Sequence, residues 1–160
     1  MHIRTFEHSD LERVIELTVE TFRPFYEDSF RPLVGEVVFT RQHGNWRDDY
    51  RALLTGLHDP RQHKYVAVAE IDGEPTGYVG WHIEPAREYG CVEILAVAGD
   101  NRGNGLGRAL CEHAFDHMRD HGAVYVEIGT GGDRFHEPAR ALYESLGCVK
   151  FPGAVYFREL

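Results

Sequence analysis

The stretch LAVAGDNRGNGLGRAL, residues 95–110, places three glycines and two arginines between an apolar run and a helical pattern. Glycines at alternate positions cost backbone entropy and add almost nothing to a core, so a chain keeps them for a special conformation or for a ligand. Four explanations compete for this stretch: a plain strand-to-helix turn, a mononucleotide loop, a dinucleotide fingerprint, and a cradle for another phosphate ligand.

The spacing of the glycines decides among these explanations. A mononucleotide loop ends in Gly-Lys-Ser/Thr, but this one ends in Gly-Arg-Ala. A dinucleotide fingerprint needs G-x-G-x-x-G, whereas Gly103, Gly105 and Gly107 are two apart throughout. A simple turn needs only one glycine. The pattern therefore favours a pyrophosphate held at a helix start, where free N–H groups and the helix dipole attract an anion and Arg102 and Arg108 add charge.

The length and composition limit the kinds of protein that the chain can be. Its 160 residues suffice for one domain, residues 1–160, and 42% hydrophobic with 27% charged residues is typical of a globular protein. The chain has no run of about 18 apolar residues, so we expect no membrane span. The start MHIRTFEHSD lacks the apolar centre of a signal peptide. The three cysteines lack metal-ligand spacing, which predicts reduced thiols, no metal and a cytoplasmic location.

The net charge of −9 narrows the choice of partners. It disfavours nucleic acid, because binding it needs a basic surface. It mildly favours a cationic small molecule, since acidic groups can focus their field in a cleft. We therefore expect a small-molecule substrate, no nucleic acid and no membrane partner.

The remaining sequence alternates strand and helix patterns in an order typical of a mixed sheet. Residues 22–36, rich in aromatic residues and with prolines at 24 and 32, predict a loop or a broken helix. The pair Asp72–Gly73 predicts the turn of a hairpin. The predicted strands are residues 2–6, 64–71, 74–85, 91–98, 123–129, 148–151 and 154–160, and the predicted helices are residues 11–22, 45–59, 105–121 and 136–147.

Two motifs in the right order resemble one family. RGNGLG at 102–107 resembles the R-x-x-G-x-G/A acyl-CoA signature of the GNAT superfamily of N-acetyltransferases. HEPARALYESLGC at 136–148 resembles the second motif of that family, N-x-x-A-x-x-L-Y-x-x-x-G-F. His136 stands where asparagine is usual, and Cys148 where phenylalanine is usual; the residues in place are Ala139, Leu142, Tyr143 and Gly147.

The resemblance implies a fold and a donor. The fold is α/β (α+β): a GNAT-like mixed, mostly antiparallel sheet of six to seven strands with splayed central parallel strands, flanked by about four helices. The donor is acetyl-CoA, and no metal takes part. Its pantetheine arm pairs with the main chain of the strand at 92–98, where the Leu95 N–H polarises the thioester carbonyl. The implied donor-binding residues are Leu95, Ala96, Val97, Arg102, Gly103, Asn104, Gly105, Leu106, Gly107, Arg108, His136 and Tyr143.

The expected chemistry needs an acid and a base. By resemblance Tyr143 protonates the leaving sulfur, since a phenol stays protonated at pH 7. Glu93 is a carboxylate on a mostly apolar strand, and period 2 predicts that it faces away from Val92 and Ile94. It resembles the strand glutamate that some family members use as general base, while others use a water chain. His82 and Glu84 on the neighbouring strand are the alternative candidates.

The acceptor site is expected in the aromatic segment before residue 64. Phe25, Tyr26 and Trp46, with acidic residues between them, suit an amine through cation–π and ion pairing. The glycine-rich loop at 129–137 is expected beside the thioester. The resulting hypothesis is transfer of acetyl to a primary amine of a small, cationic metabolite or antibiotic by direct attack in a ternary complex. The alternatives are a non-catalytic acyl-CoA sensor and a peptide or protein N-acetyltransferase. The edges of the C-terminal strands could pair two copies as a homodimer.

Overall fold

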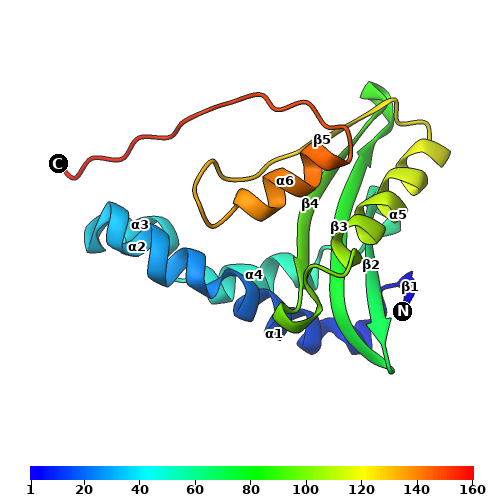
Figure 1. The fold of residues 1–160 in the computed structure, drawn as a ribbon, viewed down its shortest axis with the longest axis horizontal. Coiled ribbons are helices and arrows are strands. Elements are labelled where there is room, and N and C mark those ends of the chain that lie inside the picture. Colours follow the sequence, from blue (N-terminus) through cyan, green and yellow to red (C-terminus); the bar gives the residue numbers. More distant parts are fainter.

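A computed structural model describes all 160 residues as one mixed sheet with helices on both of its faces (Figure 1). The strands are β1 (His2–Thr5), β2 (Lys64–Ile71), β3 (Glu74–Glu84), β4 (Tyr89–Val97) and β5 (Tyr125–Ile128). The α-helices are α1 (Leu11–Arg23), α2 (Arg31–Val34), α3 (Glu36–His43), α4 (Trp46–Thr55), α5 (Leu106–Asp120) and α6 (Glu137–Ser145). None of these helices combines the length and the apolar character that crossing a membrane requires.

The sheet has the order β1-β2-β3-β4-β5, in which only β4 and β5 run parallel. Its two faces carry separate cores. On one face Val14 of α1 and Leu54 of α4 pack on β2, β3 and β4. On the other face Leu110 and Met118 of α5 pack on the same strands. The apolar stripes that predicted helices 11–22 and 105–121 are the faces that these helices bury.

The β4–β5 pair is short, and this creates an opening in the sheet. Residues Tyr89–Val92 of β4 pair with Tyr125–Ile128 of β5, and beyond Val92 the strand β4 pairs with β3 alone. The predicted splay of two central parallel strands is therefore confirmed. One edge of β4 between residues 93 and 97 faces the space that the splay opens.

A β-bulge at Glu93 corrects the predicted strand geometry. Gly80 pairs with Ile94 and Trp81 pairs with Val92, so Glu93 is an extra residue on β4. Val92 consequently packs in the core under α5, while Ile94 packs in the core under α1. The prediction that Val92 and Ile94 share one face was wrong, because a bulge resets the period-2 alternation.

The C-terminal segment is a second correction. Residues 148–160 form neither helix nor strand, so the sheet has five strands instead of six to seven. The strands predicted at 148–151 and 154–160 have the local pattern but no neighbour that supplies hydrogen bonds, and an isolated strand is not stable.

The segment that follows α1 is a broken helix, one of the two forms that the sequence predicted. Residues Pro24–Phe30 form π-helical turns that lead into α2. Pro24 stands where α1 passes into these turns, and Pro32 stands where they pass into α2. Because proline has no N–H, each removes one bond from the helical ladder at a point where the ladder changes.

An ion-pair cluster joins the start of α1 to the sheet. The Arg4 guanidinium donates to both carboxylate oxygens of Asp10 at 2.8 and 2.9 Å and to Glu70 at 2.8 Å. The Asp10 side chain is only 6% exposed. Its hydrogen bonds with Arg4 lower the pKa of Asp10 below the usual value of 3.8.

Candidate active site

The segment before α5 presents a row of free main-chain N–H groups. Gly103 and Gly105 have φ angles of +79° and +78°, a left-handed conformation that glycine adopts without strain. After this turn, Ala109 is the first residue whose N–H bonds to a main-chain carbonyl, that of Gly105 at 3.0 Å. The N–H groups of residues 103–108 have no partner within the chain. Together with the positive end of the α5 dipole they form a site suited to an anion.

The glycines of this loop have different roles. A Cβ atom at Gly103 or Gly105 would meet no heavy atom within 4 Å, so these two glycines serve backbone conformation and leave open space for a ligand. A Cβ at Gly107 would lie 3.3 Å from the Leu142 side chain. Gly107 therefore permits the close approach of α5 and α6, which brings the two sequence motifs together.

The two arginines of the loop also differ. Arg102 donates from Nε to the Val97 carbonyl at 2.9 Å, which keeps it beside the free N–H groups. Arg108 donates to Ser145 Oγ at 2.9 Å and to Glu112 at 3.3 Å. Its guanidinium connects α5 to α6 and has to leave these partners in order to bind a phosphate.

The open edge of β4 exposes the main chain of two of the three predicted strand residues. The Ala98 N–H donates to the Thr76 carbonyl at 2.8 Å, so residue 98 directs its main-chain groups toward β3. Since this direction alternates along an antiparallel strand, Ala96 also faces β3, whereas Leu95 and Val97 face the splay. The Val97 carbonyl is the one that accepts from Arg102. The Leu95 N–H thus faces the splay without a partner strand.

The loop that leads into α6 is held in shape by polar contacts. Arg140 donates to the carbonyls of Gly131 at 2.6 Å and Asp133 at 2.7 Å. His136 Nδ1 lies 2.6 Å from Asp133 Oδ1. A Cβ at Gly131 would collide with the ends of the Asp133 and His136 side chains, so a larger residue there would displace this pair. The contacts fix His136 at the edge of the splay through Nδ1, which leaves its Nε2 available to a ligand.

Tyr143 of α6 points into the same space. It lines a cavity with Glu93 and Leu95, and its hydroxyl has no hydrogen-bond partner within the chain. Burial raises the pKa of Tyr143 well above its usual value of 10. The phenol therefore remains protonated at neutral pH and can donate a proton to a group placed in the cavity.

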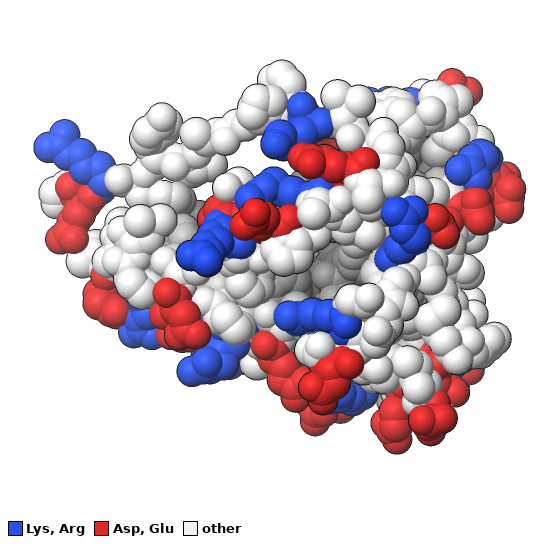
Figure 2. All heavy atoms as spheres, in the orientation of Figure 1, with Lys and Arg blue, Asp and Glu red and all other residues white.

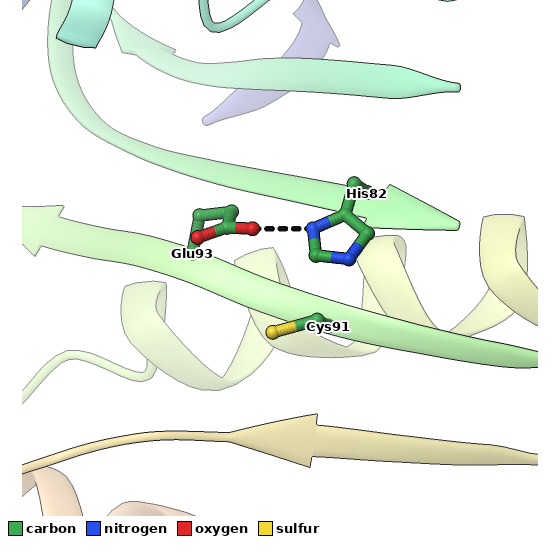
Figure 3. A group of neighbouring side chains, drawn as sticks. All are labelled: His82, Cys91 and Glu93. Carbon is green, nitrogen blue, oxygen red and sulfur yellow. Dashed lines mark hydrogen bonds and ion pairs between the residues drawn. The ribbon is translucent and has the colours of Figure 1, made fainter. Parts of the chain in front are cut away.

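The structure brings His82 and Glu93 together from two strands (Figure 3). His82 of β3 pairs across the sheet with Cys91 of β4, and the bulge turns Glu93 to the same side. His82 Nδ1 and the Glu93 carboxylate form a hydrogen bond. Glu84 lies further along β3, opposite Tyr89, and outside this contact. The two rival base candidates thus form one His–Glu pair, while Glu84 stays apart from it.

Cys91 is the third member of this cluster. Its Sγ, a nitrogen of His82 and an oxygen of Glu93 lie within 4.8 Å of one another, and such a set of donors could hold a metal ion. Burial and the carboxylates of Glu93 and Glu127 raise the pKa of Cys91 to about 11. A thiol that stays protonated is a poor nucleophile and a poor ligand at neutral pH, so the cluster suits proton transfer better than covalent chemistry.

A cavity of about 180 Å³ lies in the splay between these groups. In Figure 2 the molecule has a hollow near its centre, whose walls are mostly uncharged and whose surroundings carry charged side chains. Glu93 is the only carboxylate that lines the cavity, and Phe22, Tyr50 and Leu53 of α1 and α4 close its far side. Its lining residues are Phe22, Tyr50, Leu53, Val92, Glu93, Ile94, Leu95, Ile128, Gly129, Thr130, His136, Ala139 and Tyr143.

The aromatic residues predicted to bind the acceptor lie elsewhere. Tyr26 stacks on Trp46 at 4.7 Å between ring centroids, and the two are 9% and 2% exposed in a small core with Phe39. Phe25 packs against His136 at 4.8 Å without lining the cavity. The sequence analysis assigned no site role to Tyr50 or Leu53. The two residues lie on one face of α4, which the sequence pattern indicates. The pattern does not indicate that this face covers the splay, because that depends on the fold.

An open splay between two parallel strands, beside a helix start with unpartnered N–H groups, is the arrangement that the resemblance to N-acetyltransferases implies. The chain belongs to the acetyltransferase (GNAT) family, whose family model matches residues 11–148. Enzymes of this family use acetyl-CoA as the donor.

Relatives and solved structures agree with this assignment. A protein from Archaeoglobus fulgidus named an uncharacterized N-acetyltransferase is 27% identical over 150 residues, which are 91% of this chain and 90% of that protein. A mycothiol acetyltransferase of Thermomonospora curvata is 29% identical over 147 residues, which cover 89% of this chain but only 48% of that protein.

Solved structures show the same fold. Ribosomal-protein-alanine N-acetyltransferase from Brucella melitensis superposes with a TM-score of 0.66 at 20% identity, covering 99% of this chain and 100% of that one. AAC(6')-Iy in complex with the bisubstrate analog CoA-S-monomethyl-acetylneamine superposes with a TM-score of 0.64 at 15% identity, covering 99% and 97% of the two chains.

Proposed function

We propose that the protein transfers an acetyl group from acetyl-CoA to the primary amine of a small cationic molecule, with residues 1–160 acting as one catalytic domain. Donor and acceptor are bound together, and the amine attacks the thioester directly. The observation that carries this proposal is the junction of the unpartnered N–H groups of residues 103–108 with the open edge of β4.

This junction matches the chemistry of the donor. The N–H groups of residues 103–108 bind the diphosphate, with Arg102 beside them. The main chain of Leu95 and Val97 pairs with the amides of the pantetheine arm in the manner of an added strand. His136, whose Nδ1 donates to Asp133, accepts a hydrogen bond at Nε2 from an amide N–H of the same arm. The thioester then lies in the cavity between Leu95, Glu93 and Tyr143.

The residues around the thioester divide the proton transfers. Glu93, paired with His82, takes a proton from the substrate ammonium, and the free amine attacks the carbonyl carbon as the C–N bond forms. The Leu95 N–H stabilises the negative oxygen of the tetrahedral intermediate. The C–S bond then breaks, and Tyr143 gives its proton to the sulfur. The nitrogen loses two protons in all. One passes through Glu93 to solvent, and the other replaces the proton that Tyr143 gives to the sulfur.

The cavity also limits the acceptor. One carboxylate, Glu93, faces apolar walls formed by Phe22, Tyr50 and Leu53. This arrangement suits a molecule with a single ammonium group beside an apolar surface, and the net charge of −9 attracts such a cation. The complex of AAC(6')-Iy with an acetylneamine analog supports a small-molecule amine as the class of acceptor.

A coupled binding and turnover experiment tests the proposal. Calorimetry with coenzyme A is expected to give heat at a stoichiometry of one, and thiol release from acetyl-CoA is expected only when a small amine from a panel of polyamines, aminoglycosides and amino acids is added. Binding without turnover on any amine would instead indicate an acyl-CoA sensor. Turnover with peptides alone would indicate a peptide or protein N-acetyltransferase, and no heat with coenzyme A would refute the donor site.

A further inference from the structure

The group formed by His82, Cys91 and Glu93 contains one member that the proposed mechanism does not use. His82 and Glu93 form the base pair, whereas Cys91 is absent from the lining of the cavity. The only contact of its Sγ is a long one, 3.8 Å to the Val92 carbonyl. A half-buried thiol thus stands beside an imidazole and a carboxylate without a strong partner of its own.

The fold places these three side chains on one face of the sheet (Figure 3). Trp81 and Val92 pack under α5, so the residues next to them in sequence, His82 and Cys91, point to the opposite face. Cys91 is the direct partner of His82 across the sheet, and Glu93 lies two residues further along β4. A sulfur, an imidazole nitrogen and a carboxylate oxygen consequently lie within 4.8 Å of one another.

This set of donors has the chemistry of a zinc site. Zn²⁺ binds thiolate, imidazole and carboxylate in a tetrahedron with bonds of about 2.0–2.3 Å, which places the ligand atoms roughly 3.3–3.7 Å apart. The side chains of His82 and Glu93 are 28% and 39% exposed, so they are free to make the small movements that reach this spacing. Mg²⁺ and Ca²⁺ prefer oxygen ligands alone and fit this set poorly.

We propose that His82, Cys91 and Glu93 bind a Zn²⁺ ion, and that this ion inhibits acetyl transfer by occupying the base. Three protein ligands leave the fourth position of the tetrahedron to water. With zinc bound, the Glu93 carboxylate cannot accept a proton from the substrate ammonium, and the charge of the metal repels that cation from the cavity that Glu93 lines. The inhibition rests on the proposed function, whereas the binding of the metal does not.

The charges around Cys91 favour a divalent cation. Glu127 of β5 is the direct partner of Cys91 in the parallel pair, so a second carboxylate lies beside the thiol. Burial and the two carboxylates, Glu93 and Glu127, raise the pKa of Cys91 to about 11. A metal ion cancels this repulsion and displaces the thiol proton. Because that proton must be displaced, zinc binds more weakly here than at a preformed thiolate, and we expect it to exchange.

Metal titration of the whole chain tests the site without any need for turnover. After removal of metals with EDTA, calorimetry with zinc chloride is expected to give a stoichiometry of one, and magnesium chloride is expected to give no heat. Co²⁺ in place of zinc is expected to give the near-ultraviolet charge-transfer band of a cobalt–sulfur bond. Cys91→Ser is expected to lose this band and to raise the Kd for zinc by about 100-fold or more, because even an outer-shell partner contributes about 10–100-fold.

Cys148→Ser is the matched control, since Cys148 is also a half-buried free thiol but lies outside the group. It is expected to keep both the zinc affinity and the cobalt band. A zinc affinity that Cys91→Ser leaves unchanged, or a cobalt complex without the sulfur band, would overturn the metal site. Either result would indicate binding elsewhere, for example at His117 and His121, whose rings stack at 4.1 Å on α5.

The inhibition is measured on the acetylated amine, because released coenzyme A is itself a thiol that binds zinc. One equivalent of zinc is expected to stop transfer by the natural protein, and EDTA is expected to restore it. The same zinc concentration is expected to leave the rate of Cys91→Ser unchanged. Transfer that continues with zinc bound would overturn the inhibitory role. If no amine is acetylated at all, the proposed function fails, while the titrations still decide the metal site.

Discussion

Replacing Gly105 with alanine separates the conformational role of the α5 loop from its binding role. Gly105 has φ +78°, and an added Cβ meets no heavy atom within 4 Å, so the substitution causes no collision. A left-handed alanine costs about 1–2 kcal/mol. For a chain of this size that cost lowers the melting temperature by roughly 2–8 °C. The variant is therefore expected to fold with a modest loss of stability.

The effect on donor binding is expected to be larger. The new methyl group occupies the open space in front of the N–H groups of residues 103–108 and keeps the diphosphate from at least two of them. A hydrogen bond to a charged group contributes about 1.5–3 kcal/mol. Losing two corresponds to an increase of about 10²–10⁴-fold in the Kd for coenzyme A. Isothermal titration calorimetry of the two proteins measures this change directly.

Gly122→Ala supplies the matched control. Gly122 follows α5 at the end opposite to the glycine loop, has φ +88°, and has no heavy atom within 4 Å of an added Cβ. It is expected to lose the same stability and to bind coenzyme A as tightly as the natural protein. If Gly105→Ala kept its affinity, or if both variants lost it equally, the anion site at the start of α5 would be refuted.

Three further predictions concern the catalytic groups and the fold. Tyr143→Phe should lower kcat by about 10–10³-fold and leave the Kd for the donor and the stability unchanged. The control Tyr78→Phe should lose only stability, about 1 kcal/mol, because the Tyr78 hydroxyl bonds to a buried threonine at 2.5 Å. An equal loss of kcat and donor affinity in Tyr143→Phe would indicate that Tyr143 has only a packing role. Glu93→Gln should lower kcat by about 10²–10⁴-fold at neutral pH. Steady-state kinetics should show this difference in kcat becoming smaller as pH rises toward the pKa of the amine, because the amine then no longer needs a base; a difference that does not change with pH would contradict the role of Glu93 as base. Asp10→Asn should lose roughly 1–2 kcal/mol at pH 7 by urea unfolding, because Arg4 then keeps only Glu70 as a charged partner. Because the pKa of Asp10 is lowered on folding, this difference should vanish as pH falls through that folded-state pKa, below 3.8; a difference that persists at pH 2 would contradict this.

Much of the donor side of the proposed site could be predicted from sequence because its signals are local. The glycine loop at 102–107 and the helix at 136–147 are each read from neighbouring residues, and the hairpin around Asp72–Gly73 follows from its turn. The structure adds a second reason for the glycine at 107, because a Cβ there would crowd the Leu142 side chain where the two motifs meet.

The acceptor side and the sheet edges could not be predicted in this way. Tyr26 and Trp46 looked like an amine site but stack in a core, because their segment folds as helices whose packing the sequence pattern did not reveal. The strands expected at 148–160 are absent because a strand requires a neighbour, and whether an edge is available is a property of the whole sheet.

By itself, the sequence determined the order of most elements, the family resemblance and the glycine-rich turn before α5, since these depend on spacing along the chain. Only the tertiary structure decided which groups meet across the opening. It joined His82 to Glu93 through a one-residue bulge and turned Tyr143 toward them from a distant helix. The physical reason is that hydrogen bonding between strands and packing between helices depend on contacts between residues far apart in the chain. The local periodicity of the sequence does not specify these contacts.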